Sequence, residues 1–293
     1  MKSLSLVLVS VTVTVTACGA ARTVAATAPG SPTAFDAARS DPKAIAVADQ
    51  VLAAVGGEAA WAKVKQLRWA QKFLDKDNVV LEAEQAWDRW EGRHHLDARA
   101  GGSHFMTMYE LWGDRANAYL ADKDDDLRLV SGDQKKKLLG EAKKRWIDDA
   151  YSLTMQFRLK EPGVQLAYLG ERPELGAQPG EGGAAPPMKY EVVKVTFAAK
   201  AGPRDGDVYR VYVDKETHLI DSTEYLAPGK PQGDTDPAVA YKWGDWVDAG
   251  GLKFATTRQN MGYPEKVVYS DVKVAEKVDE ELFVPTLEDT EKL

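Results

Sequence analysis

Apolar and polar residues alternate with a period of two through most of the chain between residues 67 and 274. This period is typical of β-strands that have one buried face and one solvated face. Short polar or glycine-containing turns separate most of the segments, and helices do not alternate with the strands as they would in parallel βαβ units. The pattern therefore predicts one antiparallel sheet and argues against a doubly wound fold. The predicted strands are 67–75, 79–90, 93–99, 103–112, 115–121, 127–130, 164–170, 188–199, 208–214, 219–226, 238–248, 252–261 and 266–274.

Two regions change to helical spacing. Pro42 follows Asp41, a suitable N-cap, and apolar residues then recur every three or four positions as far as residue 67, with a break at Gly56 and Gly57. This predicts two short helices or one kinked helix. A further helix is predicted at 133–148, capped by Asp133, and residues 151–159 are predicted to be extended. The apolar stripe of that helix consists of Leu138, Leu139, Ala142, Trp146 and Ile147.

The chain as a whole is predicted to be mainly β with helices, an α+β protein. Its 293 residues are enough to bury a substantial core, and the continuity of the strands favours one domain over two. The formal net charge of −7 argues against a nucleic-acid partner, because duplex binding requires a basic face.

The N-terminus carries an export signal. Lys2 precedes an uncharged stretch at 3–17, which has the length of a signal-peptide core and is too short to span a bilayer as a helix. An edge strand is the alternative, since residues 11–15 alternate. The stretch ends in VTACG at 15–19, which resembles a bacterial lipobox, where the cysteine becomes the lipidated first residue. Cys18 is the one cysteine of the chain, so it cannot form an intramolecular disulfide or a multi-cysteine metal site.

These features divide the chain into three parts. Residues 1–17 are predicted to be a lipoprotein signal peptide, and residues 18–41 a lipidated cysteine followed by a flexible tether rich in Ala, Thr, Ser, Gly and Pro. Residues 42–293 are predicted to form the folded domain. Membrane attachment through Cys18 places the protein in the cell envelope, and Gly19 after the cysteine points to the outer membrane by the sorting rule of enterobacterial lipoproteins.

Several motifs, in the same order over some 230 residues, resemble the superfamily of outer-membrane lipoprotein-sorting proteins, the Lol-type carriers and receptor. The resemblance implies an incomplete antiparallel β-barrel, a strongly curved sheet with helices on its concave side and an apolar trough that holds acyl chains. A lipid or a lipoprotein is the implied ligand, and no cofactor is implied. The motifs are VGGEAAW at 55–61, VKQL at 64–67, DDAY at 148–151, YVDKETHLI at 212–220, GGLKF at 250–254, YSDVKV at 269–274 and LFVP at 282–285.

The large apolar residues of the first predicted strands share one strand phase, which places them on one face of the sheet. We predict that they line the apolar trough. The alternative is that they form an ordinary filled core under the helices. The residues are Trp69, Phe73, Leu81, Trp87, Phe105 and Tyr109.

Motifs for catalysis and metal binding are weak. The sequence contains no G-x-S-x-G, H-E-x-x-H or P-loop pattern. His94 and His95 are neighbours in a strand and point to opposite faces, so they cannot chelate together, although His104 could join one of them. The acidic run at 122–126 lacks the glycine of a calcium loop and is predicted to be a solvated turn. A hydrolase that uses acids of the strand at 79–90 is left open as a minor alternative.

Six basic residues at 135–137 and 143–145 lie on one predicted helix of this acidic chain. They form either a solvated face or a contact surface for anionic head groups. The whole pattern predicts a non-enzymatic, membrane-tethered envelope lipoprotein that binds a lipid acyl chain or a lipidated partner. The alternative is an envelope interaction module with a filled core and no lipid ligand.

Overall fold

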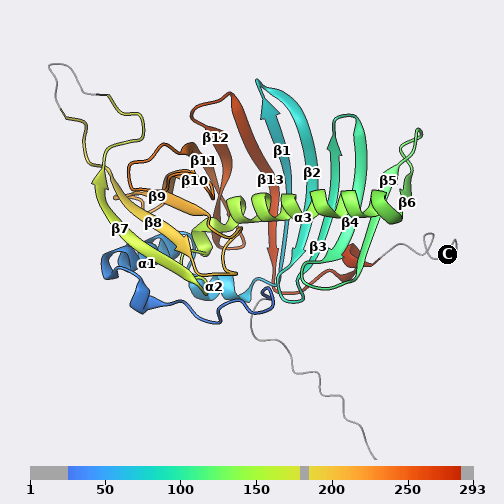
Figure 1. The fold of residues 1–293 in the computed structure, drawn as a ribbon, viewed down its shortest axis with the longest axis horizontal. Helices are drawn as coiled ribbons and strands as arrows, with labels where there is room; N and C mark the ends of the chain where they lie inside the picture. The colour runs from blue at the N-terminus through green and yellow to red at the C-terminus, as the bar shows by residue number, and fades with distance from the viewer. Residues whose placement is uncertain (1–25, 179–184, 285–293) are drawn as a thin grey trace, which may run out of the picture.

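The computed structural model describes residues 26–178 and 185–284. Thirteen strands of these residues form one antiparallel sheet, in the order β6-β5-β4-β3-β2-β1-β13-β12-β11-β10-β9-β8-β7. The sheet curves but does not close, and β6 and β7 are its two edges (Figure 1). The predicted fold, mainly β with helices on the concave side of a strongly curved antiparallel sheet, is confirmed.

Each strand is a neighbour of the next along the chain except β6 and β7, which are the two edges, and β1 also pairs with β13, which joins two half-sheets. The first half-sheet contains β1 (Gln66–Asp75), β2 (Asn78–Asp88), β3 (Arg93–Ala100), β4 (Ser103–Glu110), β5 (Ala116–Ala121) and β6 (Leu127–Leu129). The second contains β7 (Val164–Arg172), β8 (Tyr190–Phe197), β9 (Val208–Asp214), β10 (Ile220–Leu226), β11 (Val239–Ala249), β12 (Leu252–Asn260) and β13 (Glu265–Ala275).

Three α-helices cover the concave face: α1 (Pro42–Ala54), α2 (Glu58–Lys63) and α3 (Gly132–Thr154). The Asp41 side chain caps α1 by accepting from the backbone N–H of Lys43 at 2.9 Å. Gly56, between α1 and α2, has φ +114°, and a Cβ there would lie 2.3 Å from the carbonyl oxygen of Gly251. Glycine is therefore required where the helical entry crosses the β11–β12 turn.

The prediction of an extended segment at 151–159 is wrong. Helix α3 continues to Thr154 and passes into a 3₁₀ turn, η2 (Met155–Phe157). Ala150, Leu153 and Phe157 extend the buried stripe of α3 at helical spacing, so packing against the sheet outweighs the short alternation in the sequence. The predicted N-cap of this helix, Asp133, lies instead in the first turn of α3, and the N-cap is Ser131.

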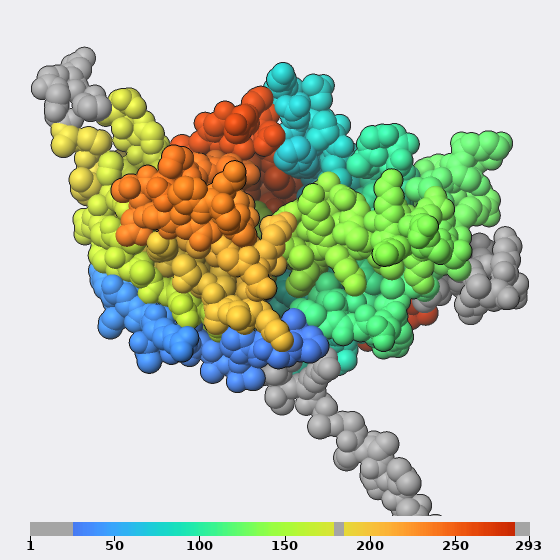
Figure 2. All heavy atoms as spheres, viewed as in Figure 1, coloured from blue at the N-terminus to red at the C-terminus, as the bar shows by residue number. Residues whose placement is uncertain are grey.

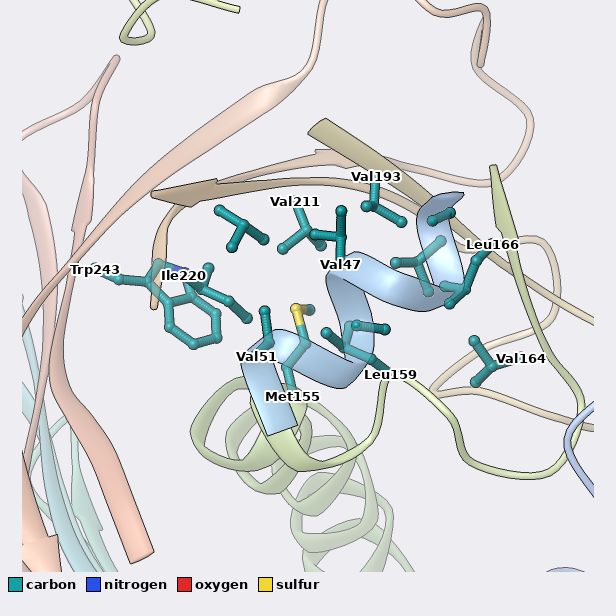
Figure 3. Close-up of a cluster of buried hydrophobic side chains, with 14 of the residues drawn as sticks. Val47, Val51, Met155, Leu159, Val164, Leu166, Val193, Val211, Ile220 and Trp243 are labelled. Carbon is teal, nitrogen blue, oxygen red and sulfur yellow. The ribbon is translucent and has the colours of Figure 1, made fainter. Parts of the chain in front are cut away.

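The helices divide the core into clusters. Helix α1 packs Val47 and Val51 against the second half-sheet together with Met155 of η2 and Trp243 of β11 (Figure 3). Helix α3 covers the first half-sheet, where Ala142 is fully buried and Leu138 and Leu139 are partly buried. Side chains therefore fill the space between α1 and the second half-sheet and between α3 and the first half-sheet.

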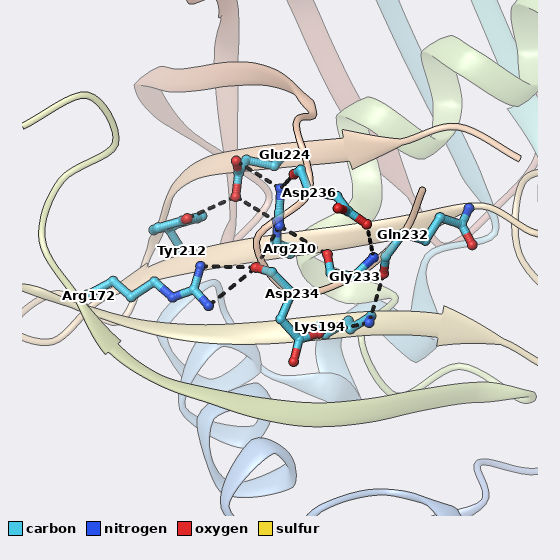
Figure 4. Close-up of polar contacts among 9 residues, drawn as sticks. All are labelled: Arg172, Lys194, Arg210, Tyr212, Glu224, Gln232, Gly233, Asp234 and Asp236. Carbon is cyan, nitrogen blue, oxygen red and sulfur yellow. Dashed lines mark hydrogen bonds and ion pairs between the residues drawn. The ribbon is translucent and has the colours of Figure 1, made fainter. Parts of the chain in front are cut away.

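A polar cluster fastens the connection between β10 and β11 to the opposite, helix-free face of the sheet (Figure 4). Arg210 is 3% exposed at its side chain and pairs with Glu224, 2.8 Å from Nε to the carboxylate. Its other N–H groups donate to carbonyl oxygens of residues 233, 234 and 236 in that connection. Glu224 supplies the counter-charge and these carbonyl oxygens supply the acceptors that a buried guanidinium requires, so we assign the cluster a structural role.

The described part of the predicted tether lies along the domain. The hydroxyl of Ser31 donates to the carbonyl oxygen of Lys200 at 2.8 Å, and the N–H of Asp41 donates to that of Leu166 at 2.8 Å. Cys18 and the signal peptide lie outside the described residues, and their assignment stays a prediction.

Candidate functional site

A cavity of about 560 Å³ lies where the two half-sheets meet the C-terminal half of α3. This volume falls within the range of about 300–1,000 Å³ that is usual for small-molecule sites. In Figure 2, the green atoms of α3 meet gold atoms of the second half of the chain near the centre of the view. The lining residues are Phe73, Arg145, Ile147, Asp148, Asp149, Tyr151, Ser152, Met155, Arg204, Tyr209, Thr223, Tyr225, Tyr241, Trp243, Arg258, Val267 and Tyr269.

Strand register explains why the sheet presents these side chains together. Trp243 of β11 pairs with Arg258 of β12, Arg258 pairs with Val267 of β13, and Val267 pairs with Phe73 of β1. Directly paired residues in an antiparallel sheet point to the same face, so these four form one row beneath α3. Aromatic and aliphatic groups make up most of the row, and Arg258 is its charged member.

Asp149 of α3 connects the cavity to a buried chain of polar side chains. Its carboxylate accepts from Gln85 Nε2 at 2.9 Å, and Gln71 Oε1 accepts from both Gln85 Nε2 and Trp69 Nε1 at 3.2 Å. Burial raises the pKa of Asp149 to about 6. Burial lowers the pKa of His94 to about 3, so its neutral ring donates from Nε2 to Gln85 Oε1 at 3.0 Å.

Arg258 is 3% exposed and lies over the ring of Trp243, with the guanidinium carbon 3.4 Å from the ring centroid. It donates to the carbonyl oxygens of Ser152, Ala255 and Thr257 at 2.7–3.0 Å. Among the described residues, no carboxylate forms an ion pair with it, and its Nε has no hydrogen-bond partner. Burial lowers the pKa of Arg258 to about 10, so the group keeps its charge at neutral pH.

The shared phase of the six predicted trough residues is confirmed by the register. Paired residues point to the same face of the sheet: Phe73 pairs with Leu81, and Trp87 pairs with Leu67. On β3 and β4, Phe105 pairs with Ala98 and Tyr109 pairs with His94, which in turn pairs with Trp87. Phe73 lines the cavity. The other five lie in the core clusters beneath α3: Trp69 and Trp87 with Leu67, and Leu81, Phe105 and Tyr109 with Ala142. Their contact with a ligand stays a prediction.

The sequence analysis did not predict Arg258 or Asp149 as site residues, although the position of each in the sequence pattern is unusual. Arg258 stands in phase with Leu252 and Phe254, so a charge occupies an inward position of β12. Asp149 follows Ala142 by seven residues and Trp146 by three, so it occupies the apolar stripe of α3. A charged residue at a buried position of an amphipathic element indicates either a buried polar network or a binding site.

The remaining candidates lie apart from the cavity. His104 contacts Asp97 at 3.0 Å and Asp125 at 2.7 Å on the outer side of the first half-sheet. Within residues 26–178 and 185–284, no group of three or more His, Cys, Asp or Glu has a geometry suited to a metal ion. The run at 122–126 is the predicted turn, in which Asp122 Oδ1 accepts from the N–H groups of Asp124 and Asp126.

The acids left open for a hydrolase do not converge. Glu82 pairs with Lys72 at 2.7 Å, and both side chains are about half exposed. Asp88 is buried, pairs with Arg93 at 2.7 Å and caps the turn after β2 by accepting from the N–H groups of residues 90 and 91. These contacts give both carboxylates a structural role.

On α3, Lys136, Lys137, Lys143 and Lys144 are exposed, whereas Arg145 is half-buried and borders the cavity. Contact of the lysines with anionic head groups stays a prediction. Of the helices that the structure describes, none combines the length and apolar character needed to cross a bilayer.

No family model and no curated relative matches the sequence. Similar solved structures include a DUF1329 family protein from Desulfovibrio piger (11% identity, 84% of this chain and 98% of that chain covered, TM-score 0.43). A putative outer membrane lipoprotein-sorting protein domain from Vibrio parahaemolyticus is also similar (10% identity, 82% of this chain and 96% of that chain covered, TM-score 0.41). A LolA superfamily protein from Nitrosomonas europaea is a third similar structure (8% identity, 83% of this chain and 97% of that chain covered, TM-score 0.45).

The Vibrio and Nitrosomonas proteins belong by their descriptions to the group that the sequence motifs resemble.

Proposed function

We propose that the mature protein is a membrane-tethered envelope lipoprotein, anchored through Cys18, that binds a lipid acyl chain or a lipidated partner in the cavity under α3 and has no catalytic role. We place it on the periplasmic side of the outer membrane. The cavity itself carries the proposal, because ten of its seventeen lining residues, five of them tyrosines, are aromatic or aliphatic. Binding of an acyl chain requires burial of apolar surface, and these side chains supply it.

A second candidate is an envelope interaction module that takes no lipid. The observation in its favour is the dense packing of Trp69, Leu81, Trp87, Phe105 and Tyr109 under α3, which leaves the space between the half-sheets as the available volume. The two candidates differ in whether a long-chain probe enters that space.

Titration of the unacylated mature chain, residues 19–293, with a spin-labelled fatty acid tests the first candidate. We expect saturable quenching of tryptophan fluorescence, because Trp243 lines the cavity. Val267→Asp introduces a charge into the apolar row and should reduce binding at least tenfold, whereas Val247→Asp, at an exposed position, should not. Unsaturable quenching that is equal in all three proteins would favour the interaction module.

Cys18→Ala tests the anchor. We expect the variant to leave the membrane fraction or to keep its signal peptide, because the thiol that accepts the lipid is absent. Cell fractionation and the intact mass of the protein measure this, with Ser10→Ala in the signal stretch as the control. An unchanged mass and unchanged membrane association in Cys18→Ala would contradict lipidation.

A further inference from the structure

The positively charged side chains around the cavity outnumber the negatively charged ones. Three arginines and two aspartates border it. Arg204 pairs with Asp148, and Asp149 accepts its hydrogen bond from the neutral Gln85. Arg145 approaches Glu141 outside the cavity at 3.5 Å. Arg258 thus remains as a buried positive charge that no carboxylate of the described chain neutralises.

A buried charge without a counter-ion is unfavourable, and the carbonyl oxygens and the Trp243 ring offset only part of that penalty. A guanidinium carries five N–H groups. Three of these donate to backbone carbonyls, and Nε has no partner among the described residues. Spare donors on a cation at the wall of a cavity match the oxygens of a carboxylate or phosphate.

The other groups of the cavity suit the remainder of such a ligand. Phe73 and Val267 continue the row away from Arg258, and Ile147 of α3 and Met155 of η2 also line the cavity. The hydroxyl of Tyr225 donates to Asp207 at 2.8 Å, so its one donor is already used, and its ring remains available for apolar contact. The cavity therefore combines one cationic position with an extended apolar wall.

We propose that the cavity binds a single-chain anionic amphiphile, whose carboxylate or phosphate head group pairs with Arg258 and whose acyl chain lies along Phe73 and Val267. This rests on the proposed function and narrows it. The volume of about 560 Å³ suits one chain, whereas a lipidated protein partner would bring several.

Displacement of a neutral fluorescent probe, N-phenyl-1-naphthylamine, from the unacylated mature chain tests the proposal with ligands that share an 18-carbon chain. Oleate and oleoyl lysophosphatidate carry the anionic head groups, and oleyl alcohol and monoolein are the neutral counterparts. We expect at least one anion to displace the probe at about tenfold lower concentration than either neutral ligand, which corresponds to about 1.4 kcal/mol. The better anion identifies the head group.

Arg258→Gln should remove this preference, and Arg258→Lys should keep most of it even if the glutamine variant folds poorly. Arg89→Gln is the matched control. Arg89 is also buried, lies 3.7 Å from the Trp61 ring centroid and donates to the carbonyl oxygens of Trp61 and Val64, but it does not line the cavity. Its substitution should lower stability and leave the preference intact.

Two results would overturn the proposal: equal displacement by anionic and neutral ligands in the parent protein, or an anion preference that Arg258→Gln retains. In both, the acyl-chain function would stand without the role of Arg258. If neither the probe nor any of the four ligands binds, the proposed function itself fails.

Discussion

Truncation of Trp69 to alanine is expected to lower the free energy of unfolding by about 3–5 kcal/mol, the usual range for a fully buried aromatic residue. Trp69 is 2% exposed and packs at the centre of the sheet, with its ring centroid 6.3 Å from that of His94. Its removal leaves a cavity beneath α3 and takes away the indole N–H that donates to Gln71. Urea unfolding followed by circular dichroism measures the loss.

Trp69→Phe separates the two contributions, because it keeps most of the aromatic volume and removes only the N–H. Gln71 Oε1 still accepts from Gln85, so we expect the phenylalanine variant to lose about 1–2 kcal/mol. A loss below about 1 kcal/mol for the alanine variant would mean that Trp69 is not packed as described.

Asp149→Asn is expected to raise the free energy of unfolding at pH 7 by about 3 kcal/mol, since each unit of pKa shift corresponds to about 1.4 kcal/mol. Burial raises the pKa of Asp149 from 3.8 to about 6. Between these values the folded chain holds a proton that the unfolded chain has lost. The stability contributed by the protonated acid is therefore complete below pH 3.8 and is lost as the pH rises through 6.

Asparagine at position 149 cannot ionise, and its side-chain oxygen can still accept from Gln85. The difference in unfolding free energy between Asp149→Asn and the parent protein should therefore grow from pH 4 to pH 6 and stay constant above. Chemical denaturation at pH 4, 5, 6 and 7 measures it. A pH-independent difference for Asp149→Asn would contradict the raised pKa.

Local sequence patterns predicted part of this fold correctly. The alternation of Leu67, Trp69 and Phe73 predicted an inward face, and the register confirms it. Helix α1 was readable because Asp41 and Pro42 are a standard N-terminal signal. The end of α3 was not readable, because residues 151–157 combine alternation with helical spacing, and packing against β12 decides between the two.

The site shows the same division. The sequence by itself determined the antiparallel sheet and the face that carries the large apolar residues, because these depend on period and phase. It also predicts the export signal with Cys18, from a short contiguous motif. Only the tertiary structure decided that five of the six predicted residues pack in the core clusters and that the cavity, which Phe73 lines, lies at the junction of the half-sheets. It also placed Arg258 and Asp149 at the cavity, although they are 109 residues apart in the chain. The β1–β13 pairing and the crossing of α3 create that proximity, and long-range contacts of this kind leave no local pattern in a sequence.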